Sequence, residues 1–186
     1  MRNLALAGAL VLIALGFEAR EKRIAQAIAL DAPGWQAPEI VGIEHWINSA
    51  PLTLSGLRGK VVVVNFWTFD CANCQHTLPH VVEWYEKYKE HGLVVIGIHT
   101  PEFSHERGRA ATEAAVNQYG IRYPVAQDNN SATWKAYGYQ YWPAFYVIDA
   151  SGAVRYEHFG EGGYQEAEAA IRQLLAESSA YREAHI

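Results

Sequence analysis

Cysteine is scarce in this chain of 186 residues, which contains only Cys71 and Cys74. Two cysteines cannot form the network of disulfides that stabilises many small secreted domains. They also cannot supply the four thiolates of an all-cysteine zinc site. Because only two residues separate them, the two thiols are expected to act together, as a redox pair, as half of a metal site, or as two small apolar side chains.

Positive charge is also in short supply. Lysine and arginine total 15 against 20 acidic residues, and the formal net charge is −5. Binding to nucleic acid through its phosphates needs a basic surface, so the sequence predicts no nucleic-acid partner. Half of the residues are hydrophobic and 12% are aromatic, which excludes a globally disordered chain. The length fits one domain with a short appended segment.

The N-terminal apolar run is short. Residues 4–17 carry no charge, follow Arg2 and precede the charged stretch 18–23. Such a run fits the core of an export signal, of roughly 7 to 15 residues, better than a spanning helix of about 20. Residues 1–30 are therefore predicted to be a signal peptide or an N-terminal membrane anchor. The protein is then exported, periplasmic or extracytoplasmic, and touches a membrane only through this segment. A buried domain helix is the alternative, but the run lacks a polar face.

Residues 31–186 alternate short apolar runs with helical patterns. The prolines and glycines of residues 31–60 indicate a linker and loops. Strands are predicted at 61–66, 93–98, 123–126, 144–148 and 154–158, with a tight turn at 149–152. Helices are predicted at 73–90, 110–119, 132–137 and 164–176, followed by a frayed tail at 177–186. This order predicts an α/β fold with a mixed central sheet and helices on both faces.

The cysteine pair lies where the strand 61–66 gives way to the helix 73–90, so Cys71 falls at or just before the first helical turn. Free N–H groups and the positive end of the helix dipole stabilise a thiolate there. Cys74, one turn later, is placed to attack a disulfide formed on Cys71. The order strand, Cys-x-x-Cys, helix therefore predicts disulfide exchange.

A zinc site is the competing interpretation, because His76 and His80 lie four residues apart on the same helix as the cysteines. Cys74 and His76 are only two residues apart and point in different directions from a helix. One zinc ion could not gather all four side chains. The sequence therefore predicts no metal site.

The residues around the pair resemble the thioredoxin superfamily. Trp67 lies four residues before the first cysteine and Pro79 lies five after the second, as in thioredoxins. Pro143 stands before the predicted strand 144–148, at the position of the family's cis-proline. Longer stretches are similar to the exported TlpA-like branch, and most of all to the thioredoxin-like domain of DipZ-type proteins: residues 46–49, 97–103, 141–144 and 159–162.

The resemblance covers about residues 38–176 and implies a thioredoxin fold with a TlpA-like central insertion between residues 101 and 130. It implies a thiol:disulfide oxidoreductase in which Cys71 attacks, Cys74 resolves and Pro143 shapes a groove for the substrate backbone. No cofactor beyond the redox-active disulfide is expected. The implied partners are exported protein thiols and disulfides and a membrane electron donor of DipZ type, which makes the protein a reductant.

The aromatic residues divide into two groups. Trp67 and Trp142, which lie beside the cysteines and the proline in sequence, are predicted to flank the site and to present an apolar surface to a partner's disulfide. The others are predicted to pack in the interior: Trp84, Trp134, Tyr137, Phe145 and Tyr146.

The usual proton acceptors of such sites are missing. Asn65 stands where thioredoxin has a buried aspartate, and Thr77 stands where TlpA-like relatives often carry a glutamate. Parallel strands deliver the loops that follow them to the same edge of a sheet. The residues after the strand 93–98 should therefore lie near the cysteines, and His99 and Glu102 are the candidate substitutes.

Two other functions compete with disulfide exchange. Thr68 lies three residues before Cys71, as in the Thr-x-x-Cys motif of peroxiredoxins, but Val64 replaces the proline that the motif also needs. Because of the partial match, a peroxiredoxin-like peroxidase is the enzymatic alternative. A binding module that keeps the thioredoxin fold without turnover is the non-enzymatic one.

Overall fold

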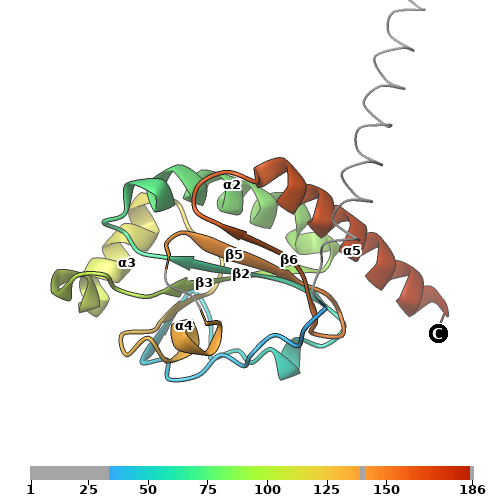
Figure 1. The fold of residues 1–186 in the computed structure, drawn as a ribbon, viewed down its shortest axis with the longest axis horizontal. Helices are drawn as coiled ribbons and strands as arrows, with labels where there is room; N and C mark the ends of the chain where they lie inside the picture. Colours follow the sequence, from blue (N-terminus) through green and yellow to red (C-terminus); the bar gives the residue numbers. More distant parts are fainter. Residues whose placement is uncertain (1–33, 139–140, 185–186) are drawn as a thin grey trace, which may run out of the picture.

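A computed structural model describes residues 34–138 and 141–184 (Figure 1). Its strands are β1 (His45–Ile47), β2 (Val61–Trp67), β3 (Leu93–His99), β4 (Val125–Gln127), β5 (Ala144–Ile148) and β6 (Val154–Phe159). Its helices are α2 (Ala72–Tyr88), α3 (Arg109–Gln118), α4 (Ala132–Ala136) and α5 (Tyr164–Ala184). Short 3₁₀ turns stand at η1 (Ser55–Leu57), η2 (Lys89–His91) and η3 (Ser104–Arg107).

The strands form one mixed sheet in the order β1-β4-β3-β2-β5-β6. β3 runs parallel to β2 and β4, whereas β1, β5 and β6 pair antiparallel with their neighbours. Trp67 at the end of β2 is level with His99 at the end of β3. The loops after these two strands therefore leave the sheet at the same edge, where the cysteine pair begins.

Both faces of the sheet are covered, as the sequence predicts. Every residue of β2 is buried, and successive side chains point to opposite faces. Val61, Val63 and Trp67 belong to a core cluster with residues of α2, α3 and α5. Val62 and Phe66 belong to a second cluster with residues of α4 and of the segment before β2.

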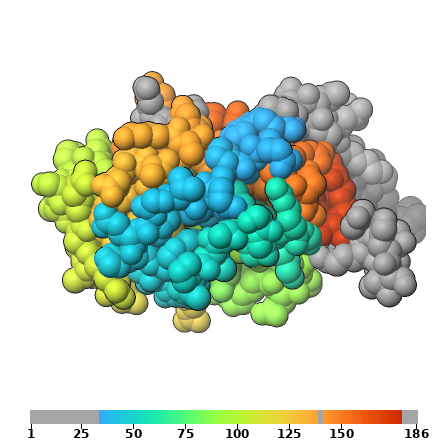
Figure 2. All heavy atoms as spheres, turned by 90° about the horizontal axis from the view of Figure 1, so that it is seen from below, coloured from blue at the N-terminus to red at the C-terminus, as the bar shows by residue number. Residues whose placement is uncertain are grey.

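The two figures show these layers. In Figure 1, α2 and α5 lie above the sheet and α4 lies below it. Figure 2 views the molecule from below, where the blue and teal segment that leads to β2 covers this face beside the orange region of α4. The predicted α/β class with helices on both faces is confirmed.

The aromatic core is confirmed for the residues assigned to it by sequence. Phe66 makes edge-on contacts with Trp134 and Tyr137, at ring-centroid distances of 5.5 and 5.1 Å. On the other face, Trp84 contacts Phe145 at 5.4 Å. These side chains, together with Tyr146, are buried.

Two local predictions are corrected. α5 continues to Ala184, so residues 177–184 are helical and not a frayed tail. The sequence there contains neither proline nor glycine to end the helix, and Ser178 donates a hydrogen bond to the Gly59 carbonyl at 3.2 Å. The segment 31–60 is also more than linker and loops, because it contributes β1 to the sheet edge.

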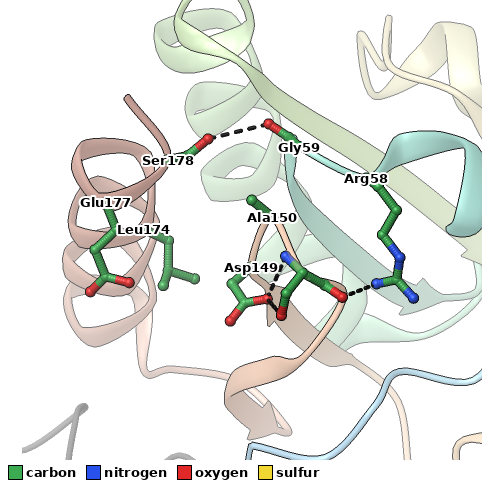
Figure 3. Close-up of a pocket in the computed structure, with 8 residues that line it drawn as sticks. Arg58, Gly59, Asp149, Ala150, Leu174, Glu177 and Ser178 are labelled. Carbon is green, nitrogen blue, oxygen red and sulfur yellow. Dashed lines mark hydrogen bonds between the residues drawn. The ribbon is translucent and has the colours of Figure 1, made fainter. Parts of the chain in front are cut away.

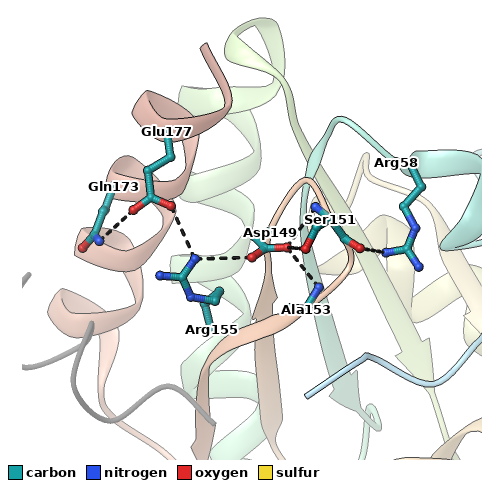
Figure 4. A network of polar contacts seen from close by, with 7 residues as sticks. All are labelled: Arg58, Asp149, Ser151, Ala153, Arg155, Gln173 and Glu177. Carbon is teal, nitrogen blue, oxygen red and sulfur yellow. Dashed lines mark hydrogen bonds and ion pairs between the residues drawn. The ribbon is translucent and has the colours of Figure 1, made fainter. Parts of the chain in front are cut away.

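At the opposite end of the sheet from the cysteines, a tight turn joins β5 to β6 as predicted. The Asp149 carboxylate accepts hydrogen bonds from the N–H groups of Ser151 and Ala153 at 2.9 and 3.0 Å (Figure 4). It also faces Arg155, which pairs with Glu177 of α5 (Figure 4). The turn is thereby tied to α5.

A cavity of about 560 Å³ lies between this turn and α5 (Figure 3). Leu174 and Ala150 contribute apolar atoms to its lining, and Arg58 and Glu177 contribute charged groups. The cavity is built from residues that precede β2 and follow β5, so it is remote from the cysteine end of the sheet.

The predicted signal peptide or anchor, residues 1–30, lies outside the described residues. Within residues 34–138 and 141–184, no helix combines the length and the apolar character needed to span a membrane.

Candidate functional site

The cysteine pair stands at the start of α2. Cys71 is the residue that caps the helix, in an extended conformation, and the Cys74 N–H donates to its Sγ at 3.3 Å. Both thiols are free. Cys71 is partly exposed, whereas Cys74 is completely buried. Only the first thiol is therefore open to a partner.

The two thiols have opposite protonation preferences. The Cys74 thiol donates a hydrogen bond to Cys71, and with help from the N–H groups of Cys74 and Asn73 it lowers the pKa of Cys71 to about 7, against burial and the charge of Glu102. The same thiol hydrogen bond, followed by burial and by the charges of Cys71 and Glu106, raises the pKa of Cys74 far above its ordinary value. Near neutral pH the pair thus holds a thiolate on Cys71 and a proton on Cys74.

Pro143 lies at the same edge of the sheet. The Trp142-Pro143 peptide bond is cis, and the next residue, Ala144, pairs with Phe66 near the end of β2. Trp142 is partly exposed and stacks on Trp134 at 4.2 Å. The structure therefore brings Pro143 and Trp142 to the cysteine end of the sheet.

Trp67 does not present a surface to a partner, and this prediction is corrected. Its side chain is completely buried and makes edge-on contacts with His99 at 5.1 Å and with Tyr119 at 6.5 Å. Gly97 leaves room for it, because a Cβ there would lie 3.0 Å from Trp67 Nε1. Trp67, the last residue of β2, therefore points into the core, where it belongs to the same cluster of buried side chains as Cys74.

The two candidate proton acceptors lie in different environments. His99 is completely buried and stacks on Phe69 at 5.4 Å, and neither ring nitrogen has a hydrogen-bond partner among the described residues. Burial lowers the pKa of His99 to about 4, although the charge of Glu106 opposes the shift, so the imidazole is neutral at neutral pH. Glu102 is exposed, and its charge raises the pKa of Cys71.

Uncharged side chains occupy the positions of the missing bases. Asn65 is buried and donates to the Ala144 carbonyl at 3.2 Å. Thr77 is buried, and its hydroxyl shares a hydrogen bond with Tyr164 at 3.1 Å. Neither can take up a proton from Cys74.

A buried carboxylate that the sequence analysis missed lies beside the pair. Glu106 of η3 is completely buried and accepts hydrogen bonds from the Thr68 hydroxyl and from the Asp70 N–H, the latter at 3.0 Å. Its second oxygen accepts from the N–H groups of Glu102 and Phe103, each at 2.8 Å. Burial raises the pKa of Glu106, but these hydrogen bonds outweigh it and lower the pKa below its ordinary value.

The two histidines of α2 contact the β6–α5 connection and the first residue of α5. His76 pairs with Glu161 at 3.1 Å, and His80 stacks on Tyr164 at 3.8 Å. In the part of the chain that the structure describes, no group of three or more His, Cys, Asp or Glu side chains is arranged to hold a metal ion.

A thioredoxin-like sheet with a cysteine pair at the start of the following helix defines the class of thioredoxin-like thiol–disulfide oxidoreductases. The chain belongs to the AhpC/TSA family, whose model matches residues 30–157. This finding and the relatives below confirm the resemblance to TlpA-like and DipZ-type thioredoxin-like proteins.

The relatives include proteins of known class. Protein DipZ of Mycobacterium tuberculosis is 52% identical over 144 residues, which are 75% of this chain and 20% of DipZ. The chain thus spans about a fifth of the length of the DipZ proteins it matches. Thiol-disulfide oxidoreductase ResA of Bacillus thuringiensis is 31% identical over 76% of this chain and 78% of ResA. A crystal structure of a thioredoxin-like superfamily protein, 32% identical, matches 75% of this chain and 96% of its own with a TM-score of 0.70.

Proposed function

We propose that the protein reduces disulfides of exported proteins through Cys71 and Cys74. The observation that carries the proposal is the asymmetry of the pair. Cys71 is accessible and has a pKa of about 7, whereas Cys74 is buried and keeps its proton. An accessible thiolate with a buried thiol behind it is the arrangement that disulfide exchange requires.

The exchange proceeds in two displacements. The Cys71 thiolate attacks one sulfur of a partner's disulfide, the partner's S–S bond breaks, and the departing thiolate takes a proton. Cys74 then loses its proton and attacks Cys71 Sγ, which forms the Cys71–Cys74 disulfide and releases the partner's second thiol. The partner gains two electrons and two protons: the cysteine pair supplies both electrons and the Cys74 proton, and solvent supplies the second proton. The electrons come from the two thiols, so no bound cofactor is needed for this step.

Residues at the same edge of the sheet support substrate binding and proton transfer. Pro143 and Trp142 are proposed to form the groove beside Cys71. His99 is proposed as the acceptor of the Cys74 proton, because its imidazole is neutral and its ring nitrogens have no hydrogen-bond partner among the described residues. Burial makes it a weaker base than an ordinary histidine, since it lowers the pKa to about 4. Glu102 is the second candidate. It is exposed, and its charge raises the pKa of Cys71, so a role in setting that pKa fits it better than proton acceptance.

The setting of the reaction is proposed to be outside the cytoplasm. The predicted signal or anchor at residues 1–30 supports export to a periplasmic or other extracytoplasmic space, with residues 4–17 as the membrane contact. A reductant in an oxidising compartment must itself be reduced again. We therefore propose a membrane electron donor of DipZ type as one partner and exported protein disulfides as the other.

The peroxidase alternative is disfavoured by the contacts of Thr68. In the Thr-x-x-Cys arrangement the hydroxyl would have to assist Cys71, but here it donates to Glu106. A reduced sample that does not consume peroxide is the expected result. A binding module without turnover would behave identically with and without Cys71.

The reduction potential of the pair tests the proposal. The full chain is equilibrated in defined thiol/disulfide buffers, and alkylated cysteines are counted by mass. We expect a potential near or below that of thioredoxin, roughly −270 mV. A value near that of a strong oxidant, roughly −120 mV, would show a disulfide donor instead. If no disulfide forms, exchange itself is disproved.

Single cysteine variants test the assignment of roles. Cys74→Ser should accumulate a mixed disulfide with a disulfide-containing protein, because the resolving thiol is gone. Cys71→Ser, its matched control, should accumulate none, because Cys74 is buried. Non-reducing gel electrophoresis followed by mass spectrometry measures both. Equal trapping by the two variants would contradict the assignment.

A further inference from the structure

Glu106 joins the two loops that meet at the cysteine end of the sheet. One carboxylate oxygen accepts from Thr68 and Asp70, in the loop that leads from β2 to Cys71. The other accepts from the backbone of Glu102 and Phe103, in the loop after β3. Four donors satisfy a carboxylate that is completely buried, and such hydrogen bonding stabilises its charged form.

The charge of this ionised group acts on the buried thiol of the pair. Cys74 interacts with the backbone N–H of Thr68, and the side chain of the same residue donates to Glu106. The charge of Glu106 disfavours a second negative charge on Cys74. A carboxylate with every oxygen engaged by donors is also poorly suited to accept a proton, so its effect on the thiol is electrostatic.

We propose that Glu106 is a positioning residue whose fixed negative charge adds to the Cys71 hydrogen bond and to burial in keeping the proton on Cys74 Sγ, so that the thiolate of the pair resides on Cys71. The inference rests on the proposed function, because it assigns which thiol attacks and which resolves. The protonated Cys74 can then donate its hydrogen bond to Cys71, and the attack on a partner begins from the accessible sulfur.

Other charged groups face the same region and act in a different way. His99 of β3 is neutral near pH 7, and Tyr119, after α3, has a pKa raised by burial and by the charges of Asp70 and Cys74. Asp70 is exposed and pairs with His105 at 3.1 Å. Glu102 is exposed as well, so solvent screens it. Among these groups Glu106 is the buried anion.

The test titrates Cys74 alone. In a chain carrying Cys71→Ala, the ultraviolet absorbance of the thiolate gives the pKa of Cys74 with and without Glu106→Gln. We expect the glutamine variant to lower this pKa by about one pH unit, the size of effect typical of a neighbouring charge. Glu106→Asp, which keeps the charge, should restore most of the difference. A folded glutamine variant with an unchanged pKa would overturn the proposal.

Thr68→Val distinguishes the effect of the Glu106 charge on Cys74 from the effect of the hydrogen bonds by which Glu106 holds the loop after β2. It removes a donor to the carboxylate while the charge stays, so the charge is less neutralised and the pKa of Cys74 should rise. An unchanged or lower pKa would overturn the proposal, because loosening of the loop would then explain any effect of Glu106→Gln. If Glu106→Gln does not fold, Thr68→Val decides by the same criterion.

The titration is independent of turnover. The chain with both cysteines and Glu106 intact is assayed separately for disulfide exchange. If it exchanges no disulfides, the proposed function fails while the Cys74 titration still reports on Glu106. If it exchanges disulfides and the titration shows no coupling, only the role of Glu106 fails.

Discussion

The reactivity of Cys71 depends on a few hydrogen bonds and one exposed charge. The thiol of Cys74 and the N–H groups at the start of α2 stabilise the thiolate, and the charge of Glu102 opposes them. The ordinary pKa of a free cysteine is about 8.5, so a value of about 7 places a large share of Cys71 in the reactive form at neutral pH. Much of Cys71 is therefore already a thiolate before a partner binds.

Removal of the Glu102 charge should make Cys71 more reactive in weak acid. Glu102→Gln removes a charge that raises the pKa of Cys71, so the midpoint of its alkylation rate against pH should move below about 7. Mass spectrometry of Cys71 alkylation across the pH range measures the shift. Glu113→Gln, a partly exposed acid of α3, is the matched control and should leave the midpoint unchanged.

The same variant separates the two roles considered for Glu102. If Glu102 accepted the Cys74 proton, Glu102→Gln would slow the release of a mixed disulfide. If it only tunes Cys71, release stays at the parent rate while the alkylation midpoint moves. An unmoved midpoint would contradict the tuning role.

Individual residues also show why part of the site was hidden from sequence. Glu106 lies in a charged stretch, Ser104–Arg107, that looks like an exposed turn. No spacing relates it to the cysteines, and only the meeting of two loops at the sheet edge buries it. Trp67 was placed correctly along the chain, but the direction of its side chain follows from the alternation along β2 and from the space left by Gly97.

At the scale of elements, the turn between β5 and β6 is held by one carboxylate. Asp149 accepts from two N–H groups and from the Ser151 hydroxyl, and it also faces Arg155. Burial raises the pKa of Asp149, but these hydrogen bonds outweigh it and keep the pKa low. The register of the two strands therefore depends on a charged side chain at their connection.

Loss of this carboxylate should destabilise the fold without changing the chemistry. We expect Asp149→Ala to lower the free energy of unfolding by roughly 1 to 3 kcal/mol, because donors in the turn lose their acceptor. Urea denaturation measures the difference. Glu177→Gln removes only the charge that pairs with Arg155 at the exposed side of this network, so it should lower the free energy of unfolding by no more than about 1 kcal/mol. Equal costs for both variants would refute the central role of Asp149.

The strands and most helices were predictable because their patterns are strong. The β-branched run of β2 is buried on both faces, and the buried positions Leu78, Val81, Trp84 and Tyr88 of α2 recur at helical spacing. β1 was missed because its three residues sit at the sheet edge and are only partly buried. The sequence predicts too early an end for α5, because the residues of its last turns follow no clear apolar stripe.

At the scale of the whole molecule, a neutral histidine is buried in the fold. The pKa of His99 is lowered by burial to about 4, while an ordinary histidine in an unfolded chain titrates near 6.5. The unfolded state therefore binds more protons between these two values, and stability falls as the pH is lowered from about 6.5 to 4. The full stability is present above about pH 6.5.

We expect a stability loss of roughly 2 to 4 kcal/mol from His99 across this pH window. Urea denaturation at a series of pH values measures the slope. His99→Gln should flatten the slope, whatever it costs in packing. His91→Gln, at an exposed position of η2, should leave the slope unchanged. A slope that persists in His99→Gln would show that other groups cause it.

Local sequence patterns were enough to predict the α/β class, the place of the cysteine pair at a strand-to-helix junction, and the kinship that made disulfide exchange the expected activity. These follow from local patterns of apolar residues and from short motifs, which act over a few residues. The surroundings of the thiols, in contrast, depend on how distant parts of the chain pack together. Packing between loops and strands distant in sequence brings Glu106, His99 and Trp67 to the cysteine end of the sheet. Burial there keeps His99 neutral, and hydrogen bonds keep Glu106 charged.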